Sequence, residues 1–402
     1  MTHPDTVNNL PLPEKDAAEH SNKVKECLLD KIVSNGSLSF TEYMAAVLYE
    51  PGLGYYSAGS TKLGAEGDFI TAPEISPLFS QSIAQAILPA LAEIENCSIL
   101  EVGAGSGKMA AAILAHLDSI NNLPTHYYIL ELSADLRLRQ QQFINETIPA
   151  LAEKIVWLDS IPENLNAVVI ANELLDAMPV VRFRKESQGI SIEHVNEADG
   201  EFQLLYIQDS NDTMNLRVSK RVDEIENEVN KLEVGYVSEI NFNAEDWLAS
   251  MADKLNKGVI LLIDYGYPQH EYYHPERNEG TLNCFYRHRH HSNPFLYPGL
   301  QDLTSHVDFT AIADSGINNN LSLLGYTTQS HFLFGAGIAQ LAEARTECFD
   351  DDNIVAQIEL ANEVKKLTMP YEMGEVVKAI GFSKNCNVTL EAFQFKDMRD
   401  HL

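Results

Sequence analysis

A glycine-rich turn constrains this chain more than any other segment. Residues 101–107 read Glu-Val-Gly-Ala-Gly-Ser-Gly, at the end of a short apolar run and directly before a helical run at 108–117. Glycines at such a position adopt positive φ and let the backbone approach a ligand closely, while the start of the helix offers free N–H groups. The turn therefore predicts a nucleotide-like ligand at the end of a strand.

The spacing of the glycines separates two ligand classes. The dinucleotide fingerprint is G-x-G-x-x-G, whereas this turn is G-x-G-x-G, and Lys108 stands where the third glycine of the fingerprint belongs. Glu101 lies two residues before the first glycine. A carboxylate there would repel a pyrophosphate but can hold the cationic amino end of S-adenosylmethionine, directly or through water. The turn thus favours S-adenosylmethionine.

Further polar residues follow the neighbouring apolar runs. Glu131 is placed to accept both ribose hydroxyl hydrogens, and Asp159 with Ser160 to read an adenine amino group. Alternatively, Glu131 and Asp159 are ordinary polar loop residues. The predicted cofactor-binding residues are Glu101, Gly103, Ala104, Gly105, Gly107, Glu131, Leu132, Asp159, Ser160 and Asn172, with Asp68 and Thr71 from a preceding loop.

Apolar runs alternate with helical runs along most of the chain, which predicts β-α-β units on a mostly parallel sheet. We expect strands at residues 98–102, 127–130, 155–158, 167–171, 258–263 and 321–327, and helices at 76–94, 108–117, 134–144, 336–344 and 353–367. The segment at 180–207 alternates like a hairpin around Asp199-Gly200. The segment at 266–307 has no clear periodicity.

The fold expected is α/β: a Rossmann-like sheet with a helical N-terminal region. We expect a flexible N-terminus at residues 1–20 and a helical region with a cofactor-covering loop at 21–94. The domain that carries the sheet would span 95–402, with insertions at about 180–243 and 266–306. The glycine-punctuated loop at 54–73 folds over the cofactor in this interpretation; an ordinary packed surface loop is the alternative.

The charge balance limits the partners. The chain has 58 Asp plus Glu against 28 Lys plus Arg, a formal net charge of −30, so it would repel nucleic acid. Such a surface suits a cationic substrate or basic protein, or serves solubility alone. Five scattered cysteines indicate a reducing compartment and no structural zinc. No apolar run is long enough for a membrane span, and a cytoplasmic location is expected.

The chain resembles the MidA-like S-adenosylmethionine-dependent methyltransferases, whose mitochondrial members are complex I assembly factors. The resemblance runs from about Ser37 to about Phe382. It rests on the glycine turn and on blocks at residues 40–44, 51–56, 67–74, 171–176, 263–267 and 301–309. The resemblance implies an α/β fold with a Rossmann-like S-adenosylmethionine-dependent methyltransferase sheet and an inserted lobe. For the mitochondrial relatives it also implies protein arginine as the methyl acceptor, in a subunit of respiratory complex I.

Glu173 follows the fourth strand, where methyltransferases present their acceptor, and Asp176 lies one helical turn further on. The stretch from Asn172 to Leu175 also resembles the acidic loop that grips the guanidinium in protein arginine methyltransferases. Acids at a helix start are the alternative interpretation. His306, with Asp308 in the same polar loop, could take the acceptor proton, or be structural.

Tyr55 and Phe69, together with Glu173, are predicted to bind the substrate, the two rings by contacting the sulfonium or the acceptor through their faces. The cluster Arg287-His288-Arg289-His290-His291 is interpreted as a positively charged insertion loop, and no metal site is assigned.

Three hypotheses stay open beside a protein arginine methyltransferase. They are a small-molecule methyltransferase, a non-catalytic assembly or binding factor that retains the cofactor site, and a dinucleotide oxidoreductase. The partner expected is a protein with an exposed arginine, and a homodimer is left open.

Overall fold

The computed structural model describes residues 10–58, 71–349 and 353–402 of the chain. The chain divides into two compact units. Unit 1 consists of residues 1–69, 175–246 and 267–310, and unit 2 of residues 70–174, 247–266 and 311–402. Unit 1 thus combines the N-terminal segment with the two regions that the sequence predicts as insertions.

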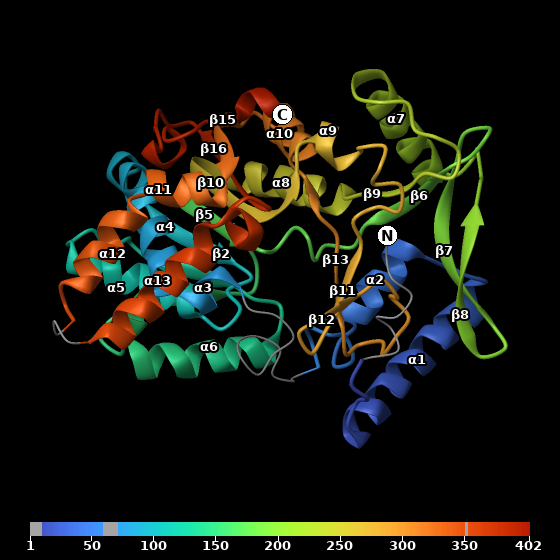
Figure 1. The fold of residues 1–402 in the computed structure, drawn as a ribbon, viewed down its shortest axis with the longest axis horizontal. Coiled ribbons are helices and arrows are strands. Elements are labelled where there is room, and N and C mark those ends of the chain that lie inside the picture. The colour runs from blue at the N-terminus through green and yellow to red at the C-terminus, as the bar shows by residue number, and fades with distance from the viewer. Residues whose placement is uncertain (1–9, 59–70, 350–352) are drawn as a thin grey trace. The chain divides into compact units, whose positions relative to one another are not determined.

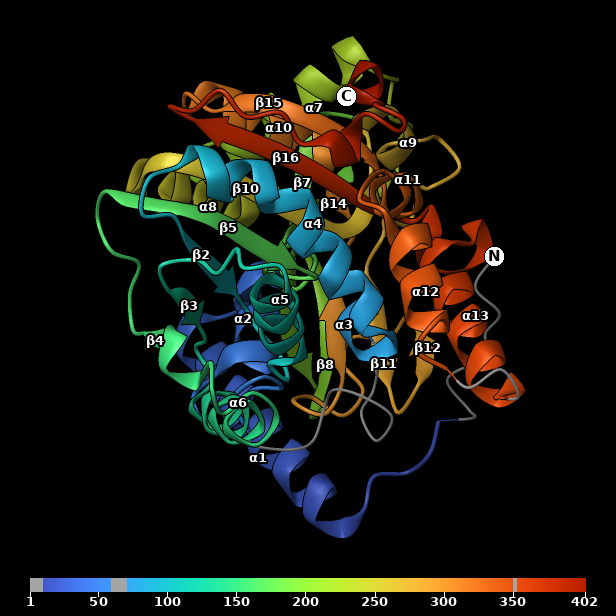
Figure 2. The same cartoon turned by 90° about the vertical axis from the view of Figure 1, so that its left-hand side faces the viewer.

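Unit 2 is built around a sheet with the strand order β15-β16-β10-β5-β2-β3-β4. The strands from β15 to β2 are labelled in Figure 1, and β3 and β4 are labelled in Figure 2. Parallel pairing joins β10 to β5, β5 to β2, β2 to β3 and β3 to β4. Only β16 runs against its neighbours on this path, pairing antiparallel with both β10 and β15. The strands are β2 (Ser98–Val102), β3 (Tyr127–Leu130), β4 (Ile155–Leu158), β5 (Leu165–Asn172), β10 (Leu255–Tyr267), β15 (Ser322–Thr328) and β16 (Val377–Lys384).

Helices cover both faces of this sheet, which explains why its central strands are apolar without alternation. Every residue of β2 is buried, and so is most of β5. Val168 and Ile170 pack into a core with α4 and α5, whereas Figure 2 shows α8 and α10 behind the sheet. The helices of this unit include α3 (Ala72–Ile75), α4 (Pro77–Glu93), α5 (Lys108–Ser119), α6 (Ala134–Thr147), α11 (Gln329–Gly335), α12 (Ile338–Thr346) and α13 (Ile354–Thr368). Two helices cross the boundary between the units, α8 (Phe242–Lys254) and α10 (Phe309–Asn318).

Unit 1 contains two small antiparallel sheets. The first has the order β1-β7-β6-β9, with β8 added to β7, and the second has the order β12-β11-β13. Their strands are β1 (Leu38–Ser39), β6 (Val181–Lys185), β7 (Ile190–Ala198), β8 (Glu201–Ile207), β9 (Val237–Ile240), β11 (Asn283–Tyr286), β12 (Arg289–His291) and β13 (Asp302–Thr304). The turn between β7 and β8 falls at Asp199 and Gly200, with φ of 55° and 80°, as the sequence predicts.

Helices α1 (Lys15–Asn35), α2 (Phe40–Tyr49) and α7 (Thr213–Glu228) complete the two cores of unit 1. Val24, Tyr43 and Val195 belong to one core, and Phe183 with Val222 to the other. The start of α2 has a capping box: the Ser39 hydroxyl accepts from the Glu42 N–H, and the Glu42 carboxylate accepts from the Ser39 N–H.

Two expectations for the N-terminal part are corrected. Helix α1 begins at Lys15, so residues 15–20 are helical and not frayed. Helices α3 and α4, which the sequence groups with the N-terminal region, belong to unit 2.

None of the helices in the described part of the chain is both long and apolar enough to cross a membrane.

Candidate functional site

The glycine turn connects β2 to α5 in a backbone conformation that favours glycine. Gly103, Gly105 and Gly107 have φ of 74°, 54° and 83°, in the left-handed region where a side chain is strained. A Cβ on Gly103 would also lie 3.2 Å from the Leu174 side chain. The turn therefore has the open strand end and helix start that a nucleoside ligand requires.

Glu101 lies beneath this turn and is only 1% exposed. Its Oε2 accepts a hydrogen bond of 2.6 Å from the Tyr127 hydroxyl on β3. Burial raises the pKa of Glu101 to about 7, although the Tyr127 hydrogen bond opposes this shift. The Glu101 carboxyl can thus change its charge near neutral pH.

Glu131 follows β3 and presents a carboxylate that accepts hydrogen bonds from the protein at both oxygens. Oε1 accepts from the Ser133 N–H at 2.9 Å, and Oε2 from Gln140 Nε2 at 3.0 Å, with the Leu132 N–H as a further donor to the carboxylate. A carboxylate has about four acceptor positions, so acceptor capacity remains for the ribose hydroxyls of a ligand. The next residue, Leu132, has an 86% exposed side chain, which offers an apolar surface to a base. These groups fit the nucleoside part of S-adenosylmethionine.

Asp159 and Ser160 follow β4 at the edge of the same sheet. The Asp159 side chain is exposed, and its Oδ1 accepts a hydrogen bond of 2.6 Å from the Arg137 guanidinium. A contact between Asp159 and an adenine amino group would therefore share this carboxylate with Arg137.

Asn172 is the last residue of β5, and Glu173 follows it in a left-handed conformation with φ of 50°. Two neighbouring hydrogen bonds hold this backbone: Glu173 N–H donates to the Ile263 carbonyl at 2.9 Å, and Leu174 N–H donates to Asp264 Oδ2 at 3.1 Å. The Glu173 carboxylate accepts from the Asn172 side chain at 3.3 Å. A non-glycine residue held in this region is uncommon and is often found at functional sites.

Helix α3 adds Glu74, which is not among the predicted site residues, and follows the predicted residue Thr71. Thr71 precedes this helix, and the Ala72 N–H lies 3.4 Å from Glu173 Oε1. Glu74 pairs with Lys108 Nζ at 2.5 Å and accepts from the Ser106 hydroxyl, so the helix is tied to the glycine turn. No local pattern marks Glu74, because its partners lie far along the chain. The predicted residues Asp68 and Phe69 lie outside the described residues.

The remaining predicted residues belong to unit 1. The Asp176 carbonyl accepts from the Ser305 N–H at 2.9 Å, which joins the segment after residue 174 to the segment that contains His306. The His306 ring lies 5.1 Å from the Tyr267 ring, and Asp308 caps the Thr310 N–H at 3.1 Å. Tyr55 is buried in a core cluster, which favours the packed-loop alternative for this side chain.

The cluster at 287–291, interpreted as a positively charged insertion loop, forms a hairpin in which Arg287 and Arg289 are exposed. Arg287 and His288 form the turn of the β11–β12 hairpin, with φ of 48° and 59°. His291 is buried, and this burial lowers its pKa to about 4, so its ring is neutral.

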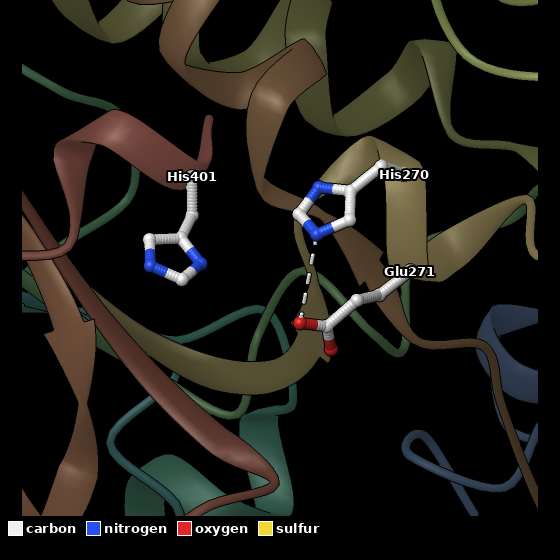
Figure 3. A group of neighbouring side chains, drawn as sticks. All are labelled: His270, Glu271 and His401. Carbon is white, nitrogen blue, oxygen red and sulfur yellow. Dashed lines mark ion pairs between the residues drawn. The ribbon is translucent and has the colours of Figure 1, made fainter.

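His270 and Glu271 on α9 (Gln269–Tyr272) form an ion pair of 3.8 Å between Nε2 and Oε1, which Figure 3 shows. Figure 3 also draws His401, which belongs to unit 2. Both members of the pair are about half exposed, and exposed His–Glu neighbours are common without a metal, so we assign none.

The order and direction of the strands in unit 2, with the glycine turn after β2 and polar groups at the ends of β3, β4 and β5, are those of a Rossmann-like nucleoside-binding fold. The profile of a family of S-adenosyl-L-methionine-dependent methyltransferases matches residues 82–327. This chain belongs to that family, and its cofactor is S-adenosylmethionine. The MidA-like family and the α/β fold expected from the sequence are confirmed.

Individual relatives agree with this assignment. A Burkholderia thailandensis protein whose crystal structure contains S-adenosylhomocysteine is 39% identical, with a TM-score of 0.92 over 98% of this chain and 100% of that chain. The Caenorhabditis elegans protein arginine methyltransferase NDUFAF7 homolog, mitochondrial, is 26% identical over 81% of this chain and 79% of its own. The Danio rerio protein arginine methyltransferase NDUFAF7, mitochondrial, is 25% identical over 87% and 84%.

Proposed function

We propose that this enzyme methylates arginine side chains of a protein substrate, with Glu173 as the residue that orients the guanidinium. The observation that carries the proposal is the left-handed conformation of Glu173 at the end of β5, beside the ends of the strands that carry the nucleoside-binding groups. The similarity to proteins named protein arginine methyltransferases supports arginine as the acceptor.

The nucleoside site in this proposal consists of the glycine turn, Glu101, Glu131 with Leu132, and Asp159. Bound S-adenosylmethionine supplies an activated methyl group on a sulfonium. A guanidinium nitrogen forms the new N–C bond as the carbon–sulfur bond breaks, and one N–H proton leaves to a base. Because the guanidinium pKa exceeds about 12, a carboxylate such as Glu173 must orient it and offset its charge.

Asp176, His306 and Asp308 are proposed as further acidic and basic groups for the acceptor. The backbone hydrogen bond from Ser305 to Asp176 supports the proposal that Asp176 and His306 act together, because Ser305 directly precedes His306 in unit 1. The role of Tyr55 in binding the substrate stays a prediction.

The test is a methyl transfer assay on cell lysate with methyl-labelled S-adenosylmethionine, using the wild type, Glu173→Gln and the surface control Glu163→Gln. Gln keeps the size of the side chain and removes its charge. We expect Glu173→Gln to lower labelling by about 100-fold or more, to leave S-adenosylhomocysteine binding unchanged, and Glu163→Gln to behave like the wild type.

Hydrolysis of the labelled protein then identifies the methylated amino acid. Label on a residue other than arginine, or only on a small molecule, would contradict the acceptor. Full activity of Glu173→Gln would contradict the role of Glu173. The identity of the methylated amino acid would still be decided separately, by hydrolysis of the labelled protein.

A further inference from the structure

Gln140 on α6 is a fully buried side chain that touches three parts of the nucleoside site at once. Its Nε2 donates to the Gly105 carbonyl in the glycine turn at 2.9 Å and to Glu131 Oε2 at 3.0 Å. Its Oε1 accepts from Trp157 Nε1 on β4 at 3.0 Å. The ends of β2, β3 and β4 are thereby joined through one amide.

The partners allow only one orientation of this amide. The indole N–H of Trp157 can only donate, while a carbonyl and a carboxylate can only accept. Both N–H hydrogens and the oxygen of Gln140 are therefore used, and a flipped amide would place oxygen against two acceptors. The Gln140 side chain is 0% exposed, so these protein groups are its hydrogen-bond partners in place of bulk water.

We infer that Gln140 is a positioning residue that determines how the Glu131 carboxylate is presented to the ribose hydroxyls of the cofactor. The Ser133 N–H holds Oε1, and Gln140 holds Oε2, so both oxygens of Glu131 are aimed from the protein side. The remaining acceptor positions then face the ligand in a constant geometry. Because the same Gln140 nitrogen holds the Gly105 carbonyl, the carboxylate and the glycine turn keep a constant spacing.

This inference rests on the proposed role of Glu131 in the cofactor site and does not depend on which acceptor is methylated. Two ligands isolate the ribose contact: S-adenosylhomocysteine and its 2′,3′-dideoxy analogue, which lacks both hydroxyls. The dissociation constant of the dideoxy analogue divided by that of S-adenosylhomocysteine, both measured by calorimetry with the full chain, reports the hydroxyl contact alone.

We expect Gln140→Leu to reduce this ratio by about tenfold or more, because an apolar side chain leaves Glu131 Oε2 without its donor. Affinity for the dideoxy analogue should change much less. Trp157→Phe removes only the donor that orients Gln140, and we expect a smaller reduction in the same direction.

Gln329→Leu is the matched control. Gln329 is also buried, and its Nε2 donates to the Leu367 carbonyl at 2.9 Å, within the same unit but outside the contacts of the glycine turn and Glu131. This variant should lose thermal stability and keep the wild-type ratio.

An unchanged ratio in Gln140→Leu, or an equal loss for both ligands, overturns the inference. If Gln140→Leu does not fold, Trp157→Phe decides, and an unchanged ratio there overturns it too. Glu131→Gln tests the role of Glu131 in the cofactor site separately from the positioning role of Gln140. If it leaves the ratio unchanged, the role of Glu131 is wrong, whereas a lowered ratio with no effect of Gln140→Leu rejects only Gln140.

Discussion

At the scale of single residues, burial changes what a carboxyl group can do. Glu101 lies on an all-buried strand and accepts a hydrogen bond from a tyrosine hydroxyl, and its charged form loses hydration because the side chain is buried. An exposed carboxylate such as Asp159 keeps that hydration and pairs with Arg137. Two acids of the same sheet, one on β2 and one after β4, are therefore suited to different parts of a ligand.

The raised pKa of Glu101 predicts a pH-dependent stability difference from Glu101→Gln. The folded protein holds this proton more tightly than the unfolded chain, so the wild type loses stability as pH rises from the ordinary value of 4.5 to about 7. The advantage of Glu101→Gln should grow over that interval, reach about 3 kcal/mol, and then level off. Denaturant unfolding at a series of pH values measures it.

Tyr127→Phe serves as the control for this prediction. It removes the hydrogen bond that favours the charged form of Glu101, so the pH at which the difference levels off should rise. Parallel stability curves for the wild type and Glu101→Gln would show that Glu101 is ionised normally in the folded protein.

At the scale of elements, a buried ion cluster joins three strands of unit 1. Arg182 on β6 contacts Glu193 on β7 at 2.5 Å and Glu239 on β9 at 3.1 Å, and both carboxylates are completely buried. Tyr206 donates to Glu193, and the Thr281 N–H donates to Glu239. These donors leave the buried charges well compensated, so the cluster aligns the strands.

Removal of the cation should unfold this arrangement. We expect Arg182→Leu to lower the free energy of unfolding by about 3–5 kcal/mol, since it leaves two carboxylates buried without their cation. Lys220→Leu, which breaks an exposed ion pair with Glu224 on α7, should cost less than about 1 kcal/mol. Thermal and denaturant unfolding compare the two, and equal losses would contradict a special role for the buried cluster.

At the scale of the whole molecule, the net charge of −30 acts on every approaching ligand. Negative potential raises the local concentration of a cationic protein and has little effect on a ligand of low net charge. Salt screens such attraction beyond a Debye length of about 10 Å at 0.1 M.

Salt should therefore affect the two substrates differently. Between about 50 mM and about 300 mM salt we expect the KM for an arginine-rich protein acceptor to rise by about threefold or more. The dissociation constant of S-adenosylhomocysteine, measured in the same buffers, should change little. Equal salt dependence of the two quantities would indicate that the surface charge does not steer the acceptor.

Much of the sheet could be predicted from the sequence, because its strands are short apolar runs that end at turn-forming or polar residues. The strands at 98–102, 127–130 and 155–158 lie where the sequence places them, and every residue of the first is buried. The hairpin turn at Asp199 and Gly200 was predictable for another local reason. Its backbone geometry requires positive φ, which these residue types tolerate. The boundaries of α1 were less predictable, because its first turns are polar.

The sequence by itself determined the glycine turn, the strand-end acids and hence the cofactor, because these depend on local conformation and on spacing along one chain. Only the tertiary structure decided that Gln140 and Trp157 support Glu131, that Glu74 joins Lys108, and that Arg182 joins Glu193 and Glu239. Such contacts follow from which segments pack together. Burial, which raises the pKa of Glu101 and lowers that of His291, likewise exists only once the chain has folded.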